Sequence, residues 1–116
     1  ERQRVVIAMA VAQETPLILL DEPTANLDIA HQSKVLDIVA TVQRKRQGAV
    51  IIAMHDLSLA AQYCDRLIML AEGVVHADGP PEDVLKPEII SRAYYTEVIV
   101  MRHPTAGSPV VVGVRK

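Results

Sequence analysis

The sequence contains no tryptophan or phenylalanine, only three tyrosines and a single cysteine among its 116 residues. A lone cysteine excludes an internal disulfide bond, and this usage fits a reducing compartment. Because half of the residues are hydrophobic, the core must be built from aliphatic side chains. The chain is long enough for one small domain with such a core.

The sequence also lacks an excess of basic charge and a long apolar segment. Its formal net charge is −2, so nothing indicates a polyanionic partner, and we expect no nucleic acid to bind. The basic run Arg44-Lys45-Arg46 falls at the expected end of a helix, where cations suit the helix dipole. No apolar run is long enough to span a bilayer, and no signal peptide is evident.

The first residues look like a helix that is entered part-way. Residues 3–13 are apolar, rich in alanine and free of glycine and proline, which predicts a helix that Pro16 ends. The chain begins with Glu1 rather than methionine, so we interpret it as a piece of a longer protein.

An apolar run that ends in two adjacent carboxylates is the most informative stretch of the chain. Residues 17–20 are four consecutive aliphatic residues, a pattern typical of a strand buried on both faces of a parallel sheet. Asp21 and Glu22 follow directly. Ligands of open α/β sheets bind at the carboxyl ends of strands, so these acids suit metal and water chemistry. Taken alone, the pattern also fits a helix N-cap before Pro23.

A helix and a second strand complete a βαβ unit. Residues 29–46 predict an amphipathic helix, and residues 49–54 a second buried strand that ends at His55. The apolar residues at helical spacing are Val35, Ile38, Val39 and Val42. Because the strands of a βαβ unit run parallel, Asp21 and Glu22 should share a sheet edge with His55. Successive strand residues point to opposite sides, so one acid would address a metal and the other a water or substrate.

The remainder predicts short elements that pack as a small appendage on the sheet, with one soft candidate boundary near Gly79. Ser58 is a possible cap of the first of these helices, Asp56 may serve only as a cap, and Cys64 fits a buried helical position. The expected elements are a helix over residues 58–63, strands over 66–70 and 74–77 with a turn at Gly73, short helices over 82–85 and 87–95, and strands over 97–101 and 110–114.

In this order the motifs resemble those of one family, the ATP-binding subunits of ABC transporters. Residues 17–22 resemble the Walker B strand and the glutamate that follows it, and Leu27-Asp28 resembles the D-loop. His55 resembles the switch histidine. Residues 1–5 resemble the tail of the signature motif, with Glu1 in its last position. The resemblance rests on the order and spacing of these motifs.

The resemblance implies an α/β fold, namely the C-terminal part of a P-loop NTPase (ABC ATPase) fold. It would have parallel strands with a crossover helix and a small C-terminal β-hairpin appendage. Residues 1–79 would form the C-terminal part of the ATPase core, and residues 80–116 a helical segment and the hairpin. The sequence has no Gly-x-x-x-x-Gly-Lys-Ser/Thr phosphate loop, no Q-loop and no complete signature motif. The fragment alone should therefore bind ATP poorly and hydrolyse it negligibly.

Roles for individual residues follow from the resemblance. Asp21 would hold Mg²⁺ through its water shell, and Glu22 would orient the attacking water. His55 would contact the γ-phosphate region. Asp28 would couple two ATP sites across a dimer, although it equally fits a helix N-cap. Glu1 would contribute to ATP binding as part of the signature motif. No metal is assigned to the other histidines.

For the full-length parent, the resemblance implies a peripheral ATPase on the cytoplasmic face of the cell membrane. Two such subunits would form a homodimer around ATP and drive integral membrane permease subunits. The ending, residues 97–111, resembles the strand pair of importers of iron-siderophore, haem and cobalamin. Two alternatives stay open: a soluble ATPase of the same superfamily in DNA repair or translation, and a non-catalytic fragment.

Truncation carries a further expectation about the surface. If the sheet lacks neighbours, apolar surface beside residues 17–20 and 50–52 is bare. Exposed strand edges and apolar patches favour pairing with another copy. We therefore expect the isolated fragment to self-associate or to be poorly soluble.

Overall fold

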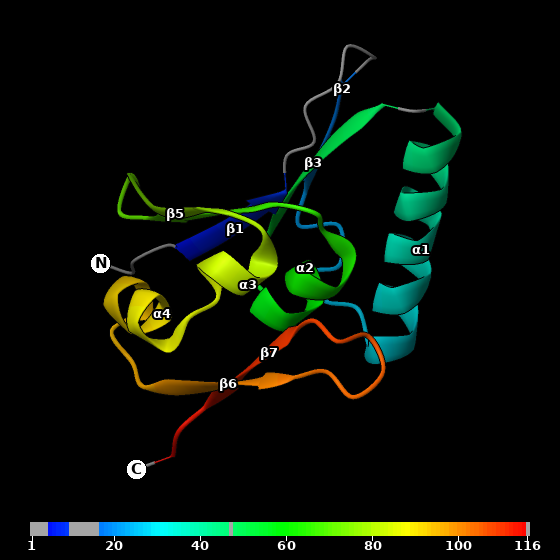
Figure 1. Cartoon of the computed structure of the whole chain (residues 1–116). Helices are drawn as coiled ribbons and strands as arrows, with labels where there is room; N and C mark the ends of the chain where they lie inside the picture. Colours follow the sequence, from blue (N-terminus) through cyan, green and yellow to red (C-terminus); the bar gives the residue numbers. More distant parts are fainter. Residues whose placement is uncertain (1–4, 10–16, 47, 116) are drawn as a thin grey trace.

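The computed structural model describes residues 5–9, 17–46 and 48–115, and for residues 5–9 it describes the backbone alone. A five-stranded sheet has the strand order β2-β3-β1-β4-β5, and a separate two-stranded sheet is formed by β6 and β7. Figure 1 shows the larger sheet in the upper half of the molecule, α2, α3 and α4 below it, and the β6–β7 hairpin at the bottom. Among the described residues, no helix combines the length and apolar character needed to cross a membrane.

The predicted βαβ unit is present with the predicted bounds. It consists of β2 (Leu17–Asp21), α1 (Ile29–Arg46) and β3 (Ala49–Met54). The two strands are parallel, in a register that pairs Leu17 with Ala49 and Asp21 with Ala53. The two carboxyl ends are therefore level with each other at one edge of the sheet.

The first strand corrects an expectation. Residues 5–9, expected to be helical, form the strand β1 (Val5–Met9), which pairs antiparallel with both β3 and β4. Three consecutive β-branched residues favour a strand, and pairing with a neighbour on each side satisfies backbone groups that would otherwise need water. This tertiary pairing outweighs the helical composition. The other parts of the expected helix, and Pro16, lie outside the described residues.

The second half of the large sheet is a tight hairpin. It is made by β4 (Leu67–Ala71) and β5 (Val74–Gly79), antiparallel to each other. Only two residues, Glu72 (φ 54°) and Gly73 (φ 75°), connect the strands. Positive φ at both central residues is the geometry of a type I′ turn, which matches the twist of the flanking strands.

The remaining elements agree with expectation to within about two residues, as is usual for element ends. They are α2 (Leu57–Tyr63), α3 (Pro81–Val84), α4 (Pro87–Tyr94), β6 (Val98–Arg102) and β7 (Pro109–Gly113). Among the described residues, the hairpin makes its main contacts to other elements with α2 and α4. It thus forms a third layer over the helices.

One face of the large sheet carries the core. Alternate residues of β3 and β4 are buried there with apolar residues of the helices. Residues on both sides of Gly79 belong to one continuous cluster. Its largest fully buried members are Leu36, Val50, Ile52, Met54, Leu67, Met69, Val84, Leu85 and Ile90. Cys64 is buried in the same cluster, as predicted.

The opposite face of the sheet is partly bare at β2. Leu17 is 54% exposed and Leu19 68%, while Ile18 and Leu20 pack on the core. The prediction that β2 is buried on both faces is therefore wrong, because the described helices pack on one side only. The prediction of bare apolar surface is confirmed for Leu17 and Leu19. It is wrong for the pair Val50 and Ile52, which point to the covered face and are 1% and 2% exposed.

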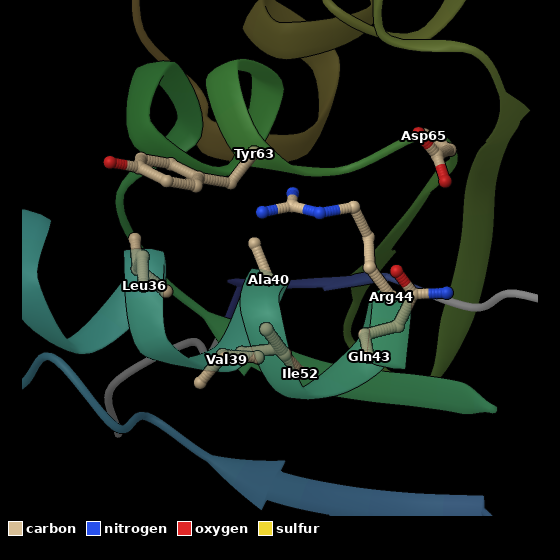
Figure 2. A pocket seen from close by; sticks show the side chains of 8 residues that line it. All are labelled: Leu36, Val39, Ala40, Gln43, Arg44, Ile52, Tyr63 and Asp65. Atoms are coloured by element: carbon tan, nitrogen blue, oxygen red, sulfur yellow. The ribbon is translucent and has the colours of Figure 1, made fainter. Parts of the chain in front are cut away.

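Helix α1 also presents a different face from the one expected. Leu36 is buried and Val39 packs on the core, but Ile38 is 63% exposed. Leu36, Val39 and Ala40 of α1 line a cavity with a volume of about 230 Å³. Figure 2 shows Tyr63, the last residue of α2, across this cavity from Leu36 and Ala40. The hydroxyl of Tyr63, which also lines this cavity, donates to Asp37 Oδ1 at 3.0 Å and ties the two helices together.

Candidate functional site

Glu22 and His55 meet at the carboxyl ends of β2 and β3. His55 Nε2 lies 2.8 Å from Glu22 Oε2, and the side chains are 49% and 29% exposed, respectively. Neighbouring parallel strands deliver both residues to the same edge, as the sequence predicts. A carboxylate and an imidazole in contact and open to solvent are suited to handle a water molecule and its proton.

The backbone of Glu22 adopts an unusual conformation. Its φ is 50°, in the left-handed region that glycine and asparagine tolerate better than glutamate. The Glu22 N–H donates to Ala53 O at 2.8 Å, which extends the β2–β3 pairing by one residue. Strained backbone of this kind clusters at functional sites, because the surroundings must hold it in place.

A pocket with a volume of about 240 Å³ opens beside this pair. Its lining residues are Glu22, Thr24, Ala25, Asn26, Gln32, Met54, His55 and Asp56. Sequence reasoning did not single out Thr24, Asn26 or Gln32. Asn26 has a φ of 64°, in the left-handed region. Thr24 is 7% exposed, and it lies in a tight loop in which the Leu27 N–H donates to Thr24 O. The one available signal was asparagine in a loop, since it tolerates left-handed backbone.

Asp21 does not line this pocket. It is the last residue of β2 and is exposed on the same side of the strand as Leu17 and Leu19. Within residues 17–46 and 48–115, no group of three or more His, Cys, Asp or Glu side chains could hold a metal ion. A single exposed carboxylate nevertheless fits Mg²⁺, which keeps several waters and binds through one or two carboxylates plus substrate phosphates. The donor set suits an ion that arrives with a nucleotide.

Asp28 caps helix α1, and this part of its prediction is confirmed. Its Oδ1 accepts from His31 N at 2.9 Å and lies 2.8 Å from His31 Nδ1. The backbone N–H of His31, followed by its ring, lowers the pKa of the Asp28 carboxyl. Asp28 does not line the pocket beside Glu22. The predicted site residue Glu1 lies outside the described residues.

Asp56 caps α2 directly after His55. Its Oδ1 accepts from Leu59 N at 3.0 Å. The alternative cap Ser58 is wrong, because the Ser58 hydroxyl oxygen instead accepts from Val111 N of β7 at 2.9 Å. The segment that follows His55 is thus held both by its own cap and by the hairpin.

Three curated relatives illustrate what the sequence is similar to. The cobalamin import ATP-binding protein BtuD of Halobacterium salinarum is 47% identical over 111 residues, which is 96% of this chain and 28% of that protein. The hemin import ATP-binding protein HmuV of Rhodococcus jostii is 48% identical over 112 residues, 96% of this chain and 38% of that protein. The ferric enterobactin transport ATP-binding protein FepC of Escherichia coli is 41% identical over 112 residues, which is 97% of this chain and 41% of that protein.

The fold has a counterpart among solved structures. A chain of an ABC transporter described as being of the metal-chelate type, in an inward-facing conformation, superposes with a TM-score of 0.71. The match covers 86% of this chain and 40% of that chain at 22% identity, so it shows the fold alone. No protein-family model matches the sequence.

The chain spans less than half the length of these relatives, yet nearly all of its own residues are aligned with them. The identity is 41–48%, and the alignments cover 96–97% of the chain. The chain therefore belongs to the ATP-binding subunits of ABC transporters, of which it represents a part.

Proposed function

We propose that the protein containing this chain hydrolyses ATP to drive import across a membrane, and that Glu22 and His55 act on the attacked phosphoryl group and its water. The observation that carries the proposal is the 2.8 Å contact between Glu22 and His55 at the level ends of two parallel strands. The family membership supplies the class of reaction.

Glu22 would orient the attacking water and accept its proton. Phosphoryl transfer depends on positioning and charge stabilisation more than on covalent chemistry. The backbone of Glu22 is held by its N–H, which donates to the Ala53 carbonyl, and its carboxylate contacts His55 Nε2. His55 would contact the γ-phosphate region from the neighbouring strand.

Asp21 would hold Mg²⁺ through water on the other side of the same strand end. The ion would neutralise charge that develops on the transferred group. Because Asp21 and Glu22 are adjacent, they leave the strand in different directions and serve different groups. Asp28 would contribute at a dimer interface while it caps α1, and Glu1 would belong to the partner-facing signature motif.

The assembly and the cargo belong to the longer protein. We infer a homodimeric ATPase subunit that works with integral membrane permease subunits on the cytoplasmic face of the membrane. The relatives are named as import or transport ATP-binding proteins, which supports the link between ATP and transport. The same names point to an iron-siderophore, haem or cobalamin as the cargo. The fragment alone, which has no phosphate loop, would be inactive.

Steady-state ATP hydrolysis by the full-length natural protein tests this function. We expect Glu22→Gln to lower kcat by about 100-fold or more, because the variant loses the proton acceptor that contributes about 10²–10⁴-fold. We expect His55→Ala to lower kcat as well, and Asp21→Asn to raise the Mg²⁺ concentration needed for half-maximal activity. Glu88→Gln, which changes an exposed carboxylate in the first turn of α4, should leave the rate unchanged.

Two results would contradict the assignment. If the Glu22→Gln variant hydrolyses ATP at the wild-type rate, Glu22 does not take part in the reaction. If the full-length protein binds no ATP, the proposed ATPase activity is excluded, and the chain would be part of a non-catalytic module.

A further inference from the structure

The β6–β7 hairpin contacts the helix that begins directly after His55. The backbone N–H of Val111 in β7 donates to the hydroxyl oxygen of Ser58, the second residue of α2, at 2.9 Å. The bond is partly buried and joins residues that are 53 positions apart. Figure 1 shows β7 passing beneath α2.

Apolar packing keeps the hairpin in this place. Val98 is 8% exposed, and Val100 and Val111 pack against the main core cluster. Val111 is paired with Val100 across the hairpin, and its N–H points outward to Ser58. An edge strand leaves such donors without a ladder partner, so Ser58 satisfies a group that would otherwise need water.

We propose that Ser58 is a positioning residue, through which the C-terminal hairpin holds the first turn of α2 and thereby keeps His55 against Glu22. This inference rests on the proposed function. His55 is the residue immediately before the Asp56 cap, so any movement of that turn moves the imidazole with it. Displacements of about 1 Å in a reacting group can cost about 10²-fold in rate.

Ser58 variants of the full-length natural protein test the contact with the hairpin. Ser58→Ala removes the acceptor for Val111 N–H, and we expect kcat for ATP hydrolysis to fall about 3- to 10-fold with KM within about twofold of wild type. Ser58→Thr keeps a hydroxyl and should restore kcat. Thr41→Val, which removes a hydroxyl that donates to Asp37 O within α1, is the matched control and should leave kcat unchanged.

The melting temperature of each variant is measured beside kcat, so that a loss of positioning is separated from a loss of stability.

The outcomes distinguish this inference from the proposed function. If wild type is active and Glu22→Gln is not, but Ser58→Ala keeps kcat within twofold of wild type, the inference is wrong and the function stands. A fall in kcat that follows the melting temperature in every variant also overturns it. If the wild-type protein hydrolyses no ATP, the proposed function fails and the inference falls with it.

Discussion

Glu22 combines a left-handed backbone with a charged contact to His55. A non-glycine residue in this conformation costs about 1–3 kcal/mol and persists only where the surroundings hold it. Here the surroundings are the Ala53 carbonyl, which accepts the Glu22 N–H, and the imidazole of His55. The strain is understandable if a carboxylate is needed at this point, because asparagine or glycine would fit the backbone better.

Cys64 makes stability depend on pH. Burial, followed by the charge of Asp65, raises its pKa from 9.0 to about 12. In the unfolded chain the thiol ionises near pH 9, whereas in the folded chain it stays protonated. Rising pH therefore stabilises the unfolded state relative to the folded state. The contribution is complete below pH 9 and is lost between pH 9 and about 12. We expect urea titrations to show the free energy of unfolding falling by about 1 kcal/mol between pH 9 and pH 10.

The control for this titration is Cys64→Ala, which lacks the ionising group and should show a flatter dependence over the same interval. Tyr94, whose pKa is also raised to about 12, adds to the fall only above pH 10, where tyrosine ionises in unfolded chains. An equally steep fall in wild type and Cys64→Ala between pH 9 and pH 10 would contradict the assignment.

At the scale of one element, α1 shows how the face of a helix is chosen. Apolar residues lie on more than one side of this helix, and their spacing alone does not say which side meets the sheet. The structure turns Leu36 inward, at 1% exposed, and Ile38 outward, at 63% exposed. The inward side is the one that meets Ile52 and the alternate residues of β2.

A matched pair of substitutions tests this orientation. Leu36→Ala should lower the free energy of unfolding by about 2–5 kcal/mol, because it leaves a cavity in the core. Ile38→Ala, two residues away in the same helix, should change it by less than about 0.5 kcal/mol, because a surface substitution alters little packing. Chemical denaturation of both variants gives the comparison, and equal losses would mean that α1 is rotated from its described position.

At the scale of the whole molecule, the large sheet is covered on one side. The exposed side carries Leu17 and Leu19 on β2, and β2 is an edge strand with no further neighbour among the described residues. An apolar edge of this kind is a template for pairing with another chain. The curated relatives are more than twice as long as the part aligned here, which gives the longer protein ample material to cover it.

The isolated 116-residue chain should therefore self-associate through this edge. We expect sedimentation velocity to show concentration-dependent oligomers of the wild-type chain, and Leu19→Lys to shift the distribution toward monomer. An inward or edge lysine is a device that natural sheets use against such pairing. Val74→Lys, on the exposed side of the opposite edge strand β5, is the control. A monomeric wild-type chain at high concentration would refute the prediction.

Much of this arrangement could be predicted from the sequence, and the failures have physical causes. Apolar strands and an intervening helix bounded by Gly48 specify the βαβ unit, and its parallel strands bring Glu22 and His55 to one edge. The strand β1 was missed, because its pairing depends on neighbours far away in the sequence. Thr24, Asn26 and Gln32 were missed at the pocket, because loop conformation depends on packing that local patterns do not encode.

The register between β2 and β3 has a consequence for how the chain can change in length. Each residue of β2 has a fixed partner, from Leu17 opposite Ala49 to Asp21 opposite Ala53. Inserting or deleting one residue within either strand would turn every following side chain to the other face and separate Glu22 from His55. The turn at Glu72 and Gly73, far from this edge, should accept added residues. Viable length variants of this segment should therefore differ in their turns and keep the spacing within residues 17–22 and 49–55.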